Sequence, residues 1–169
     1  MKLLLKRKLI PWSWHYYIED ERGNRLYLID TKMENTGREM FIHCATNLNK
    51  GEHVAFIKEQ YELFIPKYTI EINGQKVCEM MQDWKFFNRD FFFEGVPYHL
   101  EGSFLLHNYS LHRGDKPIMD FSKRLFALIR ECYHLHIFDP KDQLLCICIA
   151  AIVCWTDGRA AGIGKPSDA

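Results

Sequence analysis

Histidine and cysteine are the side chains of this chain that could hold a metal ion or transfer a proton, and the sequence contains eight histidines and six cysteines. His134 and His136 alternate with apolar residues in a predicted strand, so both imidazoles project from one face. They could join His99 or Glu101 of another strand, but a functional metal site needs three or four converging ligands. We interpret the pair as a surface feature and predict no metal-ligating residue.

Cys146 and Cys148 are the second pair that could bind a metal ion. On a helix, residues two apart point about 200° away from one another, so both thiols cannot reach one ion. We interpret them as buried thiols in a core helix. In an intracellular protein all six cysteines are expected to be reduced: Cys44, Cys78, Cys132, Cys146, Cys148 and Cys154.

No motif of nucleophilic, nucleotide-dependent or zinc-dependent catalysis is present in the sequence. Ser103 follows Gly102, but no base that could activate the hydroxyl can be identified. A glycine at this point of a strand is better explained as room for a neighbouring aromatic residue or for the helix. The sequence therefore predicts no catalytic and no cofactor-binding residue.

Two groups of cations could contact an anionic lipid surface, where each adds about 1 kcal/mol. An edge strand that carries lysines against aggregation explains the first group equally well. The groups are Lys2, Lys6, Arg7 and Lys8 in the first strand, and Lys123 and Arg124 beside Arg130.

An aromatic run occupies residues 84–93 and could dip into a membrane or stack on bases. Two strands of a barrel wall on either side of a turn at residues 88–90 explain it without either role. We favour this second interpretation, because such apolar bulk normally belongs to the core.

The whole chain has 169 residues, with 22 basic and 22 acidic side chains. This balance provides no overall field that would attract nucleic acid or an anionic membrane. The apolar part of residues 1–8 is too short for an export signal. We expect a soluble, cytoplasmic protein with one domain at residues 1–157, a mobile tail at 158–169 and no transmembrane segment.

Most of the chain is predicted to form β-hairpins. Residues 68–72 and 75–81 flank Asn73-Gly74, the pair that is typical of a type I′ turn. Fourteen candidate segments, which correspond to about a dozen strands, favour a closed or split sheet over one open sheet. The expected strands cover residues 2–10, 16–19, 25–29, 39–43, 53–60, 68–72, 75–81, 84–87, 91–93, 98–101, 104–107, 109–112, 117–121 and 132–137.

A helix is predicted after these strands, because residues 144–155 are apolar without interruption. Asp139 can cap its start, Pro140 fits the first turn, and Gly158 can end it. A helix that is apolar on every side has no face for water, and crossing a membrane takes about twenty residues. Other parts of the protein must therefore surround this helix.

The order of these segments resembles the LURP-one-related family, in particular its bacterial YxjI-like members. The resemblance covers residues 2–156 and is carried by 65–74, 98–104, 118–124 and 137–142, the last of which leads into the apolar helix. It implies the tubby C-terminal-like fold, a closed antiparallel β-barrel around a central hydrophobic helix.

Tubby proteins bind phosphoinositide head groups, but no motif of that site can be matched to residues of this chain. We therefore expect a non-enzymatic scaffold or binding module whose outer surface recognises anionic phospholipid head groups or a protein partner. The alternative is an enzyme or small-ligand carrier with a pocket between barrel and helix. No cofactor and no nucleic acid are expected.

Overall fold

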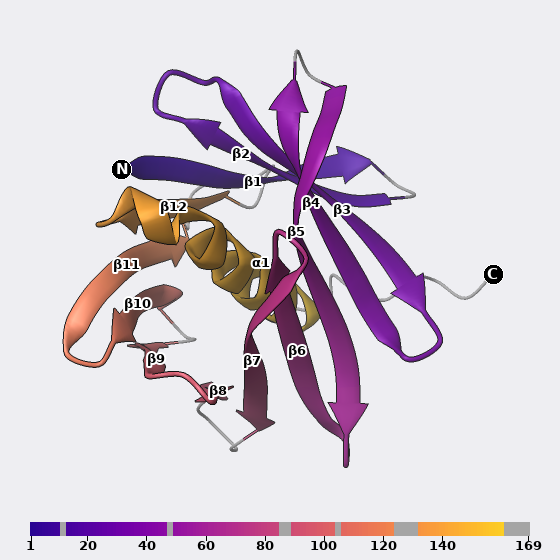
Figure 1. Ribbon diagram of the computed structural model, residues 1–169, viewed down its shortest axis with the longest axis vertical. Coiled ribbons are helices and arrows are strands. Elements are labelled where there is room, and N and C mark those ends of the chain that lie inside the picture. Colours follow the sequence, from indigo (N-terminus) through magenta and orange to yellow (C-terminus); the bar gives the residue numbers. More distant parts are fainter. Residues whose placement is uncertain (11–12, 47–48, 85–88, 104–105, 124–131, 161–169) are drawn as a thin grey trace.

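The computed structural model describes the chain except for residues 11–12, 47–48, 85–88, 104–105, 124–131 and 161–169. In the described residues, twelve antiparallel strands form one sheet that curves into a nearly closed barrel, and a helix crosses the middle (Figure 1). This confirms the predicted fold. The strands are β1 (Lys2–Ile10), β2 (Ser13–Asp20), β3 (Arg25–Glu34), β4 (Gly37–Thr46), β5 (Asn49–Glu62), β6 (Ile65–Ile72), β7 (Gln75–Trp84), β8 (Arg89–Glu94), β9 (Tyr98–Ser103), β10 (Asn108–Arg113), β11 (Lys116–Lys123) and β12 (Cys132–Ile137).

Strands that follow one another in the chain pair with each other, except β8 and β9. The order across the sheet is β8-β7-β6-β5-β4-β3-β2-β1-β12-β11-β10-β9, so β1 also pairs with β12. In that pair Lys2 lies opposite His136 and Leu5 opposite Tyr133. The two ends of the sheet, β8 and β9, are connected through residues 95–97, which brings the barrel close to closure.

The hairpin between β6 and β7 confirms the predicted turn. Asn73 and Gly74 have φ of 51° and 75°, the left-handed values that a type I′ turn requires at both positions. A predicted strand at residues 104–107 is wrong, because Leu106 and His107 lie in a turn, while 104–105 are outside the described residues. Of the predicted strand at 84–87, Trp84 ends β7, and residues 85–87 lie outside the described residues.

Asp139 starts the helical segment as predicted. Its carboxylate accepts a hydrogen bond from the backbone N–H of Lys141 at 3.2 Å, and a 3₁₀ turn, η1 (Pro140–Asp142), leads into α1 (Gln143–Ala160). The helix ends later than its expected end near Gly158. The division into one domain at 1–157 and a mobile tail stays a prediction, since residues 161–169 are outside the described part.

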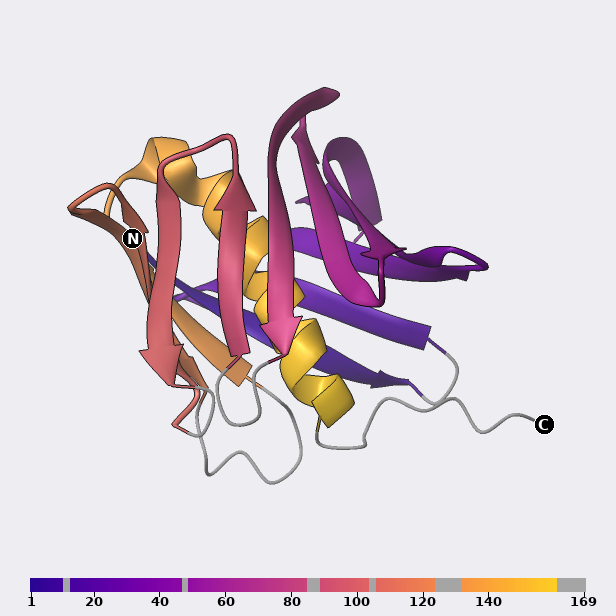
Figure 2. The same ribbon diagram turned by 90° about the horizontal axis from the view of Figure 1, so that it is seen from below.

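Strands lie on both sides of α1 in the two perpendicular views (Figures 1 and 2). From Cys146 to Trp155 no helical residue is more than 3% exposed. Apolar residues at alternate positions of the strands point inward and pack in the same core cluster, among them Ile18, Ile42 and Ile70. The predicted enclosure of the helix is therefore confirmed. No helix in the described part of the chain is long and apolar enough to span a membrane.

A buried carboxylate fixes the last turns of the helix to the barrel. Asp157 Oδ1 accepts a hydrogen bond of 3.2 Å from the Tyr109 hydroxyl. Oδ2 accepts one from the Tyr133 hydroxyl and lies 3.1 Å from His107 Nδ1. Burial raises the pKa of the Tyr133 hydroxyl, so this group remains a donor. These partners satisfy a carboxylate that is otherwise costly near the negative end of a helix.

We expect Ile149→Asp to prevent folding. Ile149 is completely buried, and an uncompensated carboxylate there costs several kcal/mol out of a total stability of about 5–15 kcal/mol. Circular dichroism and thermal unfolding measure the effect. Leu106→Asp, at an exposed position, is the control and should melt like the wild type, whereas unchanged melting of Ile149→Asp would refute the core role.

We expect Asp157→Ala to lower the free energy of unfolding by about 2 kcal/mol, because two buried tyrosine hydroxyls lose their acceptor. Urea unfolding measures this change. Asp115→Ala, in an exposed turn, should change the stability by less than about 0.5 kcal/mol. Equal stability of the two variants would contradict the role of Asp157.

Candidate binding groove on the outer face of the barrel

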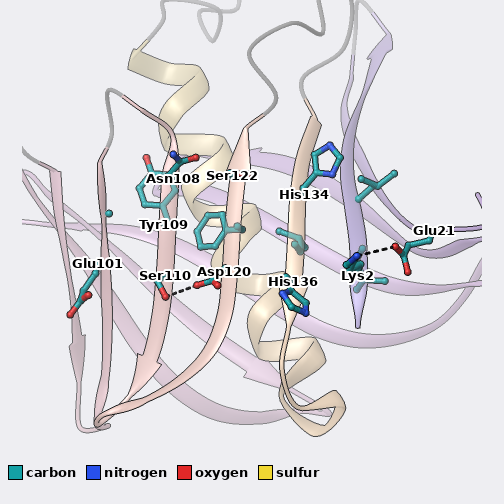
Figure 3. A pocket seen from close by; sticks show the side chains of 15 residues that line it. Lys2, Glu21, Glu101, Asn108, Tyr109, Ser110, Asp120, Ser122, His134 and His136 are labelled. Carbon is teal, nitrogen blue, oxygen red and sulfur yellow. Dashed lines mark hydrogen bonds and ion pairs between the residues drawn. The ribbon is translucent and has the colours of Figure 1, made fainter.

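A hollow of about 980 Å³ lies over strands β1, β9, β10, β11 and β12, and we call it the outer groove. Figure 3 shows its polar side chains on the side of the strands that faces away from α1. They come from strands that are far apart in the sequence. These side chains belong to Lys2, Glu21, Glu101, Asn108, Ser110, Asp120, Ser122, His134 and His136.

Strand register arranges most of these side chains in two rows. Alternate residues of a strand face outward, so residues paired across neighbouring strands stand side by side on the surface. One row runs across five strands as Lys2, His136, Asp120, Ser110 and Glu101. The adjacent row is Leu4, His134, Ser122 and Asn108.

The floor of the outer groove is firm, because it is the outer side of the packed core. Leu3, Tyr109, Phe121 and Leu135 belong to its lining and are also buried members of the core cluster around α1. The rings of Tyr109 and Phe121 stack at 5.0 Å. The polar rows are therefore held in place by strands that have little freedom to move.

The charge of the outer groove is negative. Among the described lining residues, Lys2 stands against the carboxylates of Glu21, Glu101 and Asp120. Lys2 Nζ lies 3.7 Å from Glu21, and Ser110 Oγ donates a hydrogen bond of 2.6 Å to Asp120. Both contacts are drawn in Figure 3. The surface can therefore attract cations and offers both hydrogen-bond donors and acceptors.

The structure does not gather the predicted basic groups into a positive patch among the described residues. Lys6 Nζ lies 2.5 Å from Glu19, Lys2 faces Glu21, and Arg7 is buried. Lys123 lies over the ring of Tyr133 at 5.9 Å. The side chain of Lys8, together with residues 124 and 130, is outside the described part.

His134 and His136 are exposed on the outer face of β12, as the alternation predicted. The structure does not bring them to Glu101, which lies three strands away, in the row that contains His136. It places Glu101 beside His99 and His112 instead. The sequence did not reveal this group, because His112 lies opposite His99 only through the register of β9 and β10.

Cys146 and Cys148 are buried in the core. They are free thiols, as are Cys44, Cys78 and Cys154, the other cysteines whose side chains are described. Burial raises the pKa of Cys146 to about 12, and burial also shifts the pKa of Cys148 upward, so neither is a thiolate at neutral pH. The interpretation as core thiols therefore agrees with the structure.

Ser103 has a local structural contact. Its hydroxyl accepts a hydrogen bond of 3.3 Å from the backbone N–H of Leu106, in the turn after β9. Gly102 makes room for an aromatic residue, as predicted, since a Cβ there would come within 2.8 Å of the Tyr109 ring.

The aromatic run divides between the core and the surface. Phe91 of β8 is buried, Phe92 is exposed, and Phe93 packs against Tyr98 at 5.9 Å. The predicted turn at 88–90 is wrong for Arg89 and Asp90, which already belong to β8, while residue 88 lies outside the described residues. The alternation of the three phenylalanines is that of a strand in the barrel wall.

Sequence reasoning missed an apolar hairpin tip between β5 and β6. Leu63 and Phe64 are 87% and 94% exposed, with φ of 48° and 70°. Glycine, asparagine and aspartate favour this two-residue turn, and bulky residues are strained in it. No glycine or asparagine marks the turn, which is why the sequence did not reveal it. Exposed, strained residues are typical of contact sites.

Replacing the tip by Leu63→Asn and Phe64→Gly should raise the free energy of unfolding by about 1 kcal/mol. The new pair is the one that the β6–β7 turn uses at Asn73 and Gly74, and it relieves left-handed strain. The melting temperature should rise by about 2–4 °C. Asn73→Leu with Gly74→Phe is the reciprocal control and should lower the stability. If Leu63→Asn with Phe64→Gly did not raise the stability, the proposed strain at the tip would be contradicted.

Comparison with known proteins gives the chain a family. The family model described as LURP-one-related matches residues 1–154. The chain belongs to the LURP-one-related family. The chain is 22% identical to Uncharacterized protein YxjI of Bacillus subtilis (strain 168) over 153 residues, which cover 90% of this chain and 91% of that protein. No solved structure matches this LURP-one-related chain.

Proposed function

We propose that this LURP-one-related protein is a non-catalytic binding module whose outer groove takes a segment of a partner protein with cationic side chains. The observation that carries the proposal is the composition of the groove. Three carboxylates and one lysine line it, beside hydroxyl, amide and imidazole groups. Such a surface is complementary to a polar segment that carries lysine or arginine.

The same charges make an anionic phospholipid the weaker candidate. The basic residues of β1 suggested lipid contact, but Lys2 and Lys6 stand next to Glu21 and Glu19. A lipid phosphate in the outer groove would meet more carboxylates than cations. Attraction to an anionic bilayer needs clustered, unopposed cations.

The packing of the helix favours a binding site on the outer surface over one in the lumen of the barrel. Residues from Leu145 to Asp157 are all buried between the strands, whereas the hollow of about 980 Å³ opens outside. A carrier or an enzyme would use a pocket lined by converging titratable groups. The inner cluster around Asp157 has its oxygens occupied by Tyr109, Tyr133 and His107, which supports a role in stability.

Peptides selected from a displayed random library on the purified protein should be rich in lysine and arginine. Asp120→Lys should weaken their binding at least about tenfold, because it reverses an exposed charge in the middle of the outer groove. Isothermal titration calorimetry measures the affinities, and circular dichroism checks that the variant folds.

Glu52→Lys is the matched control, an equal change of charge at an exposed position of β5 outside the outer groove. It should leave peptide binding unchanged. If Asp120→Lys and Glu52→Lys weakened peptide binding equally, the binding would reflect general charge attraction and not the outer groove. Vesicles with and without phosphatidylserine test the lipid alternative. If the protein co-sedimented with phosphatidylserine vesicles in a salt-sensitive way, and the library yielded no basic peptides, the proposed protein partner would be refuted in favour of a lipid.

A further inference from the structure

Two imidazoles and a carboxylate meet on the outer face of β9 and β10. His99 and His112 are directly paired across these strands, and Glu101 follows His99 by two positions on the same face. One ligand atom of each side chain lies within 4.8 Å of the other two. In the described part of the chain, no other group of three histidine, cysteine or acidic side chains converges in this way.

The nitrogens converge on one carboxylate. His99 Nε2 lies 3.3 Å from Glu101 Oε1, and His112 Nε2 lies 3.8 Å from Glu101 Oε2. The two rings stack at 4.8 Å with 21° between their planes, so they approach the carboxylate from the same side. Two stacked imidazoles whose nitrogens face the two oxygens of one carboxylate provide three ligand groups on one side of a candidate chelating site.

The distances between the ligand atoms of His99, Glu101 and His112 are only slightly longer than those around a bound metal ion. Metal bonds of about 2.0–2.2 Å place tetrahedral ligands about 3.3–3.6 Å apart, against the 4.8 Å that bounds the group here. His99 and Glu101 are exposed, so rotations of their side chains can close this gap. The backbone pairing of β9 and β10 does not have to change.

We propose that His99, Glu101 and His112 bind a divalent transition-metal ion, with zinc as the best-fitting ion. Imidazole nitrogen together with one carboxylate is a typical ligand set for zinc, while magnesium and calcium prefer oxygen ligands. Three protein ligands leave one position for water or another ligand. This inference differs from the expectation of no metal site, and it does not depend on the proposed protein partner.

The position of the site gives the ion a local effect. Glu101 also ends the polar row of the outer groove, so the ion lies at the rim of that surface. The ion also connects β9, the end strand of the sheet, to β10. Binding should therefore raise the melting temperature.

Titration with ZnCl₂ of chelator-treated full-length protein tests the site. Nitrogen-15 spectra of the histidine side chains should show His99 and His112 shifting together and saturating at one equivalent of zinc. MgCl₂ at the same concentrations should leave both signals in place. If the signals of other histidines shifted and saturated at lower zinc concentrations than those of His99 and His112, the proposal would be overturned.

Variants separate this site from adventitious binding. Glu101→Gln and His112→Ala should each weaken zinc binding at least about tenfold and remove the rise in melting temperature. The double variant His134→Ala with His136→Ala is the matched control, since this exposed pair lies on the same outer face, and it should bind like the wild type. If the Glu101 and His112 variants bound zinc as tightly as the wild type, with unchanged circular dichroism, the site would be refuted. Peptide binding is measured separately, without metal, so that the two proposals can fail independently.

Discussion

The burial of a helix that has no polar face is the constraint on which the structure depends. Residues from Cys146 to Trp155 can leave water only if apolar side chains surround them on all sides. Twelve strands meet this demand by turning alternate residues inward. Their other side chains point to solvent, so the polar chemistry of the described residues gathers mainly on the outside. The cluster at Asp157 is buried, as are Arg38, Glu59 and Gln82.

Local patterns were sufficient to predict the main elements. The alternation around Asn73-Gly74, the cap at Asp139 and the unbroken apolar run each specify their own conformation from nearby residues. The end of the helix could not be predicted in this way. Asp157 lies within α1 with partners from β10, β12 and the turn at His107, which are distant in the sequence. The resemblance to a family supplied the closure of the barrel.

The candidate surfaces were predictable only in part. Alternation correctly placed His134 and His136 on the outside, because parity within one strand follows from the sequence. Which residues become neighbours across strands depends on register and strand order. The pairing of β1 with β12 puts Lys2 beside His136, and that of β9 with β10 puts His99 beside His112. The ion pairs of Lys2 and Lys6 likewise depend on a partner strand.

The pairing of β1 with β12 also has a consequence for how the chain folds. Leu3 and Leu135 become neighbours only when nearly the full length of the polypeptide closes into a loop, and the segment that fills the centre follows every strand. Such long-range pairing slows folding, because loop entropy is lost before the contacts form. On the ribosome, the earlier hairpins emerge without the apolar surface that they cover in the finished protein. Completion of the barrel is therefore a late event, in which the growing chain depends on protection from aggregation.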